Sequence, residues 1–188
     1  MENREGLIWF DGEFVDWKDA NIHILNHGLH YASSVFEGER SYSGKIFKVR
    51  EHTERLFESA RALDLKIPYS VEEIIDASYK AIELNNLTDA YLRPIVWRGS
   101  EMGVSAPNAK VHCAIAVWEW PSYFTPEEIL KGIKVTLSEW KRPSPETLPC
   151  KAKAAGRYMI CTLAKQKAES KGCSDAVMRD ERDQSAET

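Results

Sequence analysis

Apolar residues gather in short segments, separated by polar residues, near the start of the chain. Two such segments, Leu7 to Phe10 and Glu13 to Trp17, are separated by Asp11-Gly12. Asp-Gly supplies the positive φ that a tight type I′ turn demands, so the pattern predicts a β-hairpin. Short strand patterns follow over residues 34–41 and 45–48. The chain therefore opens with β structure.

The pattern then changes to the period of an α-helix. From Glu51 onward, apolar residues recur on one helical face up to Leu63, and Arg55 lies on this predicted helix. A second helix begins after Ser70, which forms a capping box with Glu73. Its apolar positions continue at helical spacing to Asn85-Asn86, where a left-handed stop is easy.

Two longer apolar segments, Ala90 to Trp97 and Val111 to Trp120, predict buried strands. Residues 1–120 then form a small N-terminal domain with both helices and strands. Prolines and a charge run in residues 121–131 predict an interdomain linker. Residues 132–188 are expected to begin a larger C-terminal domain, so the predicted fold class is α+β with two domains.

The second domain has its own alternation of elements. Lys134 to Trp140 reads as a strand, Gly156 to Lys171 as a helix that stops at Gly172, and Asp175 to Met178 as another strand. A domain limited to residues 132–188 is close to the smallest size that folds independently. We therefore expect it to be incomplete, and to be finished by further sequence or by another chain.

Composition excludes several classes of protein. The chain has 188 residues, is 43% hydrophobic and 29% charged, and carries a formal net charge of −4 with no basic cluster. Nucleic acid is not an expected partner. The N-terminus is polar, and the strongly apolar run from Ala114 to Trp118 is too short to cross a bilayer. These features predict a cytoplasmic protein.

No metal site is expected. The spacing of the four cysteines contains no C-x-x-C pair, which predicts reduced, structural thiols. His23, His27 and His30 lack acidic ligands at useful spacing.

Lys153 is the strongest candidate for covalent chemistry. It lies among small residues between a proline-rich loop and a predicted helix. An amine in such a place is partly desolvated, which lowers its pKa and frees it for Schiff-base formation. By position, Lys151 is as good a candidate, and a solvated surface lysine is the commoner outcome.

Four separated blocks of sequence together resemble a known family. They are His30-Tyr31 through Phe36-Glu37-Gly38 to Arg40, Glu51 to Leu56, Ala90 to Pro94, and Lys151 to Tyr158. In this order and spacing they are similar to the branched-chain aminotransferase group of fold type IV pyridoxal-phosphate (PLP) enzymes. The resemblance covers the chain from about Ile8 to Glu187.

The resemblance implies roles for particular residues. Lys153 would form the Schiff base with PLP and carry the proton between substrate and cofactor. Tyr158 would bind the cofactor's phenolic oxygen, Arg55 its phosphate, and Glu187 its pyridine nitrogen. From the residues alone, Tyr158 could equally be a core aromatic, and Arg55 could pair with Glu51 or Glu58.

The resemblance also implies a substrate pocket. Its lining residues would be Tyr31, Phe36, Arg40, Tyr91 and Arg93, with apolar walls for a branched side chain and polar groups for carboxylates. Arg93 in a buried strand needs a partner for its charge. The implied reaction exchanges the amino group of leucine, isoleucine or valine with 2-oxoglutarate, and the implied assembly is a homodimer or higher homo-oligomer.

Two alternatives remain open on the same fold. One is a D-amino-acid transaminase or an aminodeoxychorismate lyase. The other is an inactive truncated remnant, because the glycine-containing segment that cradles the phosphate in the family is not found in these 188 residues. The charged stretch Arg179 to Ser185 also departs from the family pattern.

Overall fold

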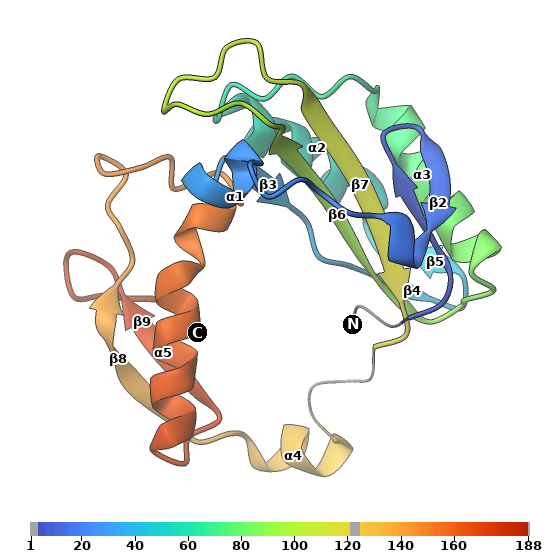
Figure 1. Cartoon of the computed structure of the whole chain (residues 1–188). Helices are drawn as coiled ribbons and strands as arrows, with labels where there is room; N and C mark the ends of the chain where they lie inside the picture. Colours follow the sequence, from blue (N-terminus) through green and yellow to red (C-terminus); the bar gives the residue numbers. More distant parts are fainter. Residues whose placement is uncertain (1–3, 121–124, 188) are drawn as a thin grey trace. The chain divides into compact units, whose positions relative to one another are not determined.

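The computed structural model of the chain describes residues 4–120 and 125–187 (Figure 1). The chain has two compact units. The first comprises Met1–Trp120 together with Ala152–Gly156, and the second comprises Pro121–Lys151 and Arg157–Thr188. The predicted α+β class is confirmed. Residues 132–188 do not all belong to one unit, because the segment Ala152–Gly156 is hydrogen-bonded to the first.

An antiparallel sheet forms the base of the first unit. Its strands follow the order β2-β1-β7-β6-β4-β5, and β3 pairs with β6 beside β4. The bounds are β1 Leu7–Phe10, β2 Glu13–Asp16, β3 Ser34–Phe36, β4 Glu39–Tyr42, β5 Lys45–Ile46, β6 Ala90–Arg98 and β7 Val111–Trp118.

The predicted hairpin is confirmed. Asp11 and Gly12 have φ values of 50° and 99°, as the type I′ turn between β1 and β2 requires. The strand expected over residues 34–41 is instead two strands. Both strands pair with β6 in the same register, and the Glu37 N–H still donates to the Pro94 carbonyl at 2.9 Å, but Pro94 has no N–H to donate in return.

Two helices cover one face of this sheet (Figure 1). They are α2, Val49–Arg61, and α3, Val71–Leu84. The Ser70–Glu73 capping box is present, and Asn86 adopts the expected left-handed conformation with φ 54°. Leu56 of α2 and Ile74 of α3 are fully buried, and they form a core with apolar residues of β6 and β7.

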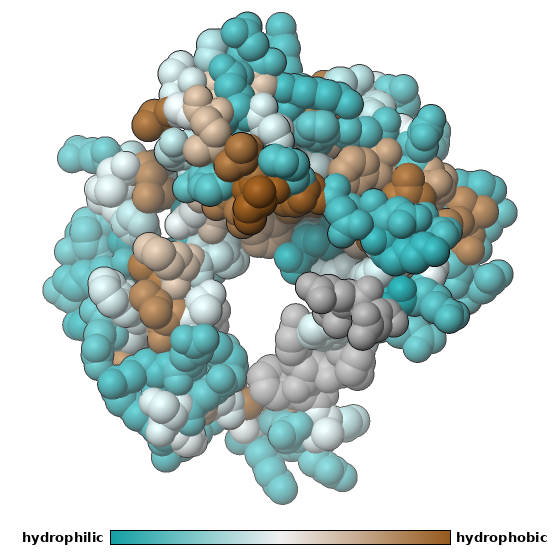
Figure 2. Space-filling model, viewed as in Figure 1, coloured by the Kyte–Doolittle hydropathy of each residue, from teal (hydrophilic) through white to brown (hydrophobic). Residues whose placement is uncertain are grey.

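The opposite face of the sheet is covered only in part, by short elements. The sequence did not predict α1, His27–Tyr31, which ends at Ala32 in a left-handed conformation, or the 3₁₀ turn η1, Trp17–Asp19. Helix α1 and the segment leading into it expose several apolar side chains, and Figure 2 shows apolar atoms gathered there. They are Ile22, Ile24, Leu25 and Leu29.

The second unit contains a three-stranded sheet and one long helix. Strands β8, Val135–Lys141, and β9, Asp175–Arg179, are parallel, and β10, Ser185–Glu187, is antiparallel to β9. Helix α5, Met159–Ser170, packs on β8 and β9, and a 3₁₀ turn, Ala155–Arg157, precedes it. The buried core is small: Ala164, Ala168, Cys173, Ala176 and Met178.

The segment predicted as a linker contains a helix. Residues 121–124 lie outside the described part of the chain, but α4 spans Pro126–Lys131. Thr125 and Glu128 form a capping box, and Pro126 occupies the first turn, where its missing N–H has no cost. The charge run that suggested a linker is the polar surface of this short helix.

None of the helices in the described residues combines the length and apolar composition needed to cross a bilayer.

Candidate functional site

The backbone of Lys153 is fixed between α2 and β3. Its N–H donates to the Ser59 hydroxyl oxygen at 2.9 Å, and its carbonyl accepts from the Phe36 N–H at 3.1 Å. The next residue, Ala154, bridges to Val35. These contacts attach the segment Ala152–Gly156 to the first unit, and they leave the Lys153 side chain half-buried.

The Lys153 amine lies beside an aromatic ring that is shared with a second cation. Its Nζ is 5.3 Å from the centre of the Phe36 ring, and the Arg93 guanidinium carbon is 4.7 Å from the same centre. Cations are attracted to ring faces at such distances. Phe36 therefore connects the candidate covalent residue to one of the candidate substrate residues.

Arg93 has a neutral hydrogen-bond partner on its own strand. Its Nη2 donates to the Tyr91 hydroxyl at 2.8 Å, because both residues point to the same face of β6. Gly38 permits this arrangement: a Cβ at that position would lie 2.3 Å from the Tyr91 hydroxyl. Arg40 lies opposite Tyr91 in the β4–β6 ladder, and its Nη2 donates to the Trp120 carbonyl at 3.0 Å.

Two arginine N–H groups on this face are buried and unsatisfied. Among the described residues, no hydrogen-bond acceptor contacts Arg40 Nε or Arg93 Nε. Leaving a buried donor unpaired is costly, and an arginine donates well to a carboxylate. An anionic group that reached either arginine would satisfy a donor that is otherwise unpaired.

Arg55 is held by a buried carboxylate. Its Nε and Nη2 donate to the two oxygens of Glu37 at 2.6 and 2.7 Å, and His52 Nδ1 lies 2.9 Å from Glu37 Oε2. Glu37 is fully buried, whereas the Arg55 side chain is half exposed. Burial raises the pKa of Glu37, but hydrogen bonds from Arg55 and His52 outweigh it and lower that pKa below its usual value.

Glu39 lies close to Glu37 and Arg55, but its environment favours the neutral, protonated form. It is buried on β4, and neither of its carboxylate oxygens has a hydrogen-bond partner among the described residues. Burial, followed by repulsion from Glu37, raises its pKa to about 8. At neutral pH the folded protein therefore holds Glu37 ionised and Glu39 protonated.

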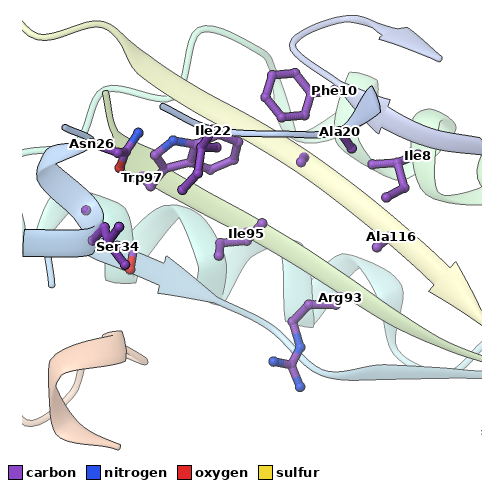
Figure 3. A pocket seen from close by; sticks show the side chains of 13 residues that line it. Ile8, Phe10, Ala20, Ile22, Asn26, Ser34, Arg93, Ile95, Trp97 and Ala116 are labelled. Atoms are coloured by element: carbon purple, nitrogen blue, oxygen red, sulfur yellow. The ribbon is translucent and has the colours of Figure 1, made fainter. Parts of the chain in front are cut away.

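An apolar cavity of about 410 Å³ lies on the same open face of the sheet. Arg93, Ile95 and Trp97 line it at alternate positions of β6, and Figure 3 shows Ile95 between the other two. The Tyr31 ring lies 4.5 Å from that of His27, and Tyr31 lines a separate cavity of about 700 Å³. The structure thus places Tyr31 and Arg93 at different hollows of the first unit.

Tyr158 and Glu187 belong to the second unit. Both line a cavity of about 210 Å³ together with Cys161. Glu187 lies in β10, and Arg142 Nε contacts its Oε2 at 3.1 Å. Arg142 is 8% exposed, and its Nη1 donates to Cys161 Sγ at 3.0 Å. Burial raises the pKa of the Cys161 thiol.

Sequence reasoning missed four residues of this arrangement: Ser59, Glu37, Glu39 and Arg142. Glu37 and Glu39 stand within the block that carried the resemblance, but nothing in their spacing indicates that they are buried beside Arg55. Ser59 and Arg142 carry no sequence signal, because their partners, Lys153 and Glu187, are distant in the chain.

Among the described residues, no three His, Cys, Asp or Glu side chains come together in an arrangement that could hold a metal ion. All four cysteines are free thiols, and Cys113 and Cys173 are buried.

Comparison with known proteins assigns the family. Residues 34–188 match the family described as amino-transferase class IV. The chain belongs to this family. It is similar to branched-chain-amino-acid aminotransferases, with 45% identity to that of Pseudomonas aeruginosa over 185 residues and 38% identity to that of Escherichia coli over 179 residues.

Solved structures of branched-chain amino acid aminotransferases agree with this assignment. The chain superposes on the Escherichia coli enzyme with a TM-score of 0.90 at 36% identity, over 95% of this chain and 61% of the other. It superposes on a T.th. enzyme with pyridoxamine 5'-phosphate with a TM-score of 0.93 at 37% identity, over 98% of this chain and 62% of the other. The match to the P. aeruginosa relative covers 96% of this chain and 60% of that protein. The chain thus spans about 60% of the length of the curated relatives that it matches.

Proposed function

We propose that the complete gene product containing this chain transfers the amino group of leucine, isoleucine or valine to 2-oxoglutarate, with PLP as cofactor. The observation that carries the proposal is the 45% identity to a branched-chain-amino-acid aminotransferase over 96% of the chain. A complex of the T.th. enzyme with N-(5'-phosphopyridoxyl)-L-glutamate, matched at TM-score 0.88, supports the choice of both cofactor and acceptor class.

The proposed cofactor residues fit PLP chemically. Lys153 offers an amine to its aldehyde, Arg55 a cation to its phosphate, Tyr158 a hydroxyl to its phenolic oxygen, and Glu187 a carboxylate to its ring nitrogen. Helix α2 positions both Lys153 and Arg55. It carries Arg55, and its Ser59 hydroxyl accepts the Lys153 N–H. When bound, PLP supplies the aldehyde and an electron-accepting ring.

The chain's own residues then have separable tasks. With PLP bound, Lys153 Nζ would take a proton from the substrate Cα and deliver it to the C4′ carbon of the cofactor, and the second half of the exchange would reverse this transfer with the 2-oxo acid. Glu187, which Arg142 contacts at 3.1 Å, would keep the ring nitrogen of bound PLP protonated. Glu37 fixes the Arg55 guanidinium through two hydrogen bonds, and Arg55 would bind the cofactor phosphate.

Substrate binding is proposed for Tyr31, Phe36, Arg40, Tyr91 and Arg93. The unsatisfied Nε groups of Arg40 and Arg93 suit a carboxylate, and Phe36 offers an apolar surface to a branched side chain. The exposed apolar residues around α1, such as Ile24 and Leu29, support a homodimer, because patches of this kind mark contacts between proteins.

The test uses the complete gene product, loaded with PLP. We expect a visible absorbance band from the Lys153 adduct that is absent in Lys153→Ala, and transamination of leucine, isoleucine and valine that falls at least about 100-fold in this variant. Lys151→Ala, an exposed lysine two positions away, is the matched control and should retain both. Light scattering of the same sample should give the mass of a dimer or higher oligomer.

The outcomes separate the alternatives. A D-amino acid or aminodeoxychorismate used in preference to leucine would indicate the second candidate activity. Borohydride trapping that labels another lysine, or none, would remove Lys153 from its proposed role. Absence of both PLP binding and transamination would indicate the inactive remnant.

A further inference from the structure

We propose that Ser59 is a positioning residue that holds Lys153 in place for its reaction with the cofactor. The role in a reaction with the cofactor rests on the proposed function, whereas the contact between Ser59 and Lys153 is present in the structure. Ser59 lies on α2, four positions after Arg55, and residues at this spacing share a helical face. It is 1% exposed, and its hydroxyl oxygen accepts the Lys153 N–H at 2.9 Å.

The contact matters because Lys153 lies far from α2 in the sequence. The segment 152–156 follows an exposed, proline-rich loop, and its neighbours Ala152 and Ala154 offer little more than methyl groups to the core. Two backbone hydrogen bonds, one to Ser59 and one from Phe36, fix the Lys153 backbone on both sides. The fixed backbone sets the point from which the lysine side chain extends, and so limits where its amine can lie.

The two hydrogen bonds differ in what a mutation can remove. The Phe36 contact is between backbone groups, so side-chain replacement leaves it intact. The Ser59 contact needs a side-chain acceptor, and its loss leaves the Lys153 N–H without its acceptor. We infer that the segment then shifts, and that the Lys153 amine moves relative to the Phe36 ring, which lies 5.3 Å away.

Ser78 on α3 provides a matched control. It is also a fully buried helical serine of the first unit, but its hydroxyl donates to the Ile74 carbonyl of its own helix at 2.8 Å. Replacing Ser78 therefore removes a buried hydroxyl of the same size without touching Lys153. Any effect shared by Ser59 and Ser78 variants reports a general loss of stability.

The experiment measures the reactivity of the amine without cofactor. The complete gene product is treated with trinitrobenzenesulfonate over a range of pH, and labelling of Lys153 and of exposed Lys151 is quantified by peptide mass spectrometry. We expect the Lys153/Lys151 labelling ratio to rise about fivefold in Ser59→Ala, because a segment that has lost one hydrogen bond opens to the reagent about five times as often. Ser78→Ala should leave the ratio at the wild-type value.

A second variant covers the case in which Ser59→Ala does not fold. Ser59→Cys keeps the size of the side chain but offers a weaker acceptor, so its ratio should fall between wild type and Ser59→Ala. A wild-type ratio in both Ser59 variants, or an equal change in Ser78→Ala, would overturn the proposal.

Borohydride trapping with PLP separates this inference from the proposed function. If both hold, the trapped fraction at Lys153 falls in Ser59→Ala and not in Ser78→Ala. If wild-type protein is not trapped at Lys153, the proposed function fails, while the labelling ratio still decides whether Ser59 positions the amine. If the labelling ratio changes but trapping at Lys153 does not, the contact is structural and the positioning role is overturned.

Discussion

Glu37 and Glu39 lie two positions apart and are both buried, but their neighbours give them opposite charge states. Arg55 and His52 lower the pKa of Glu37, whereas Glu39, without hydrogen-bond partners among the described residues, has its pKa raised to about 8. Ionising Glu39 would place a second negative charge beside Glu37. The environment of Arg55 therefore depends on pH.

Glu39 should make the protein less stable as the pH rises. The folded protein keeps the Glu39 proton up to about pH 8, while the unfolded chain releases it near the ordinary value of 4.5. Between these values the free energy of unfolding falls with increasing pH, by up to about 1.4 kcal/mol per pH unit. Urea denaturation at pH 5, 7 and 9 should show this fall.

Glu39→Gln removes the titrating group and should flatten this dependence. Glu54→Gln, at an exposed position of α2, is the control and should keep the wild-type slope. Parallel pH dependence in Glu39→Gln and wild type would contradict the assignment.

At the residue scale, the sequence could not predict which carboxylate binds Arg55. Helical spacing offered Glu51 and Glu58, but the guanidinium binds Glu37, which lies 18 positions earlier in the chain. A buried carboxylate competes better than two solvated ones, because its charge is left uncompensated without the arginine. That burial results from the packing of α2 on the sheet.

At the scale of elements, sequence signals predicted turns and helix ends correctly where neighbouring residues provide the backbone conformation or the capping hydrogen bonds. The Asp11-Gly12 turn and the stop at Asn86 followed from residues that tolerate positive φ. The same logic, Thr125 followed by Pro126 and Glu128, would have identified α4. Helix α1 gave no comparable signal, because it has only five residues and Asn26 is followed three positions later by Leu29 rather than by Glu or Gln.

The capping box of α3 should contribute measurably to stability. Ser70 accepts the Glu73 N–H at 3.2 Å, and Glu73 accepts the Ser70 N–H at 2.7 Å. Ser70→Ala removes one of these contacts and should lower the free energy of unfolding by about 1 kcal/mol. Chemical denaturation measures this loss, and Ser100→Ala, in an exposed loop, should change it by no more than about 0.5 kcal/mol.

At the scale of the whole molecule, the two units differ in their cores. The first buries large side chains such as Leu56, Ile74 and Ile115 between helices and sheet. The second buries five apolar residues in its described part, three of them alanines. Since hydrophobic stabilisation follows the apolar area removed from water, the second unit of this chain is expected to open more easily.

Hydrogen exchange on the 188-residue chain tests that difference. Amides in the middle of α5 should exchange at least about tenfold faster than those in the middle of α3, because local opening costs less where fewer apolar contacts are lost. Helix α3 in the same sample is the internal standard. Equal protection of the two helices would show that core size does not set the opening energy.

The sequence by itself determined the periodic elements, the turns, the α+β class and the family, because each depends on neighbouring residues or on the order and spacing of short blocks along the chain. Tertiary structure decided that Lys153 belongs with the first unit, that Ser59 and Phe36 hold its backbone, and that Glu37 binds Arg55. These pairings join residues far apart in sequence, and burial selects them by leaving no other partner for a polar group removed from water.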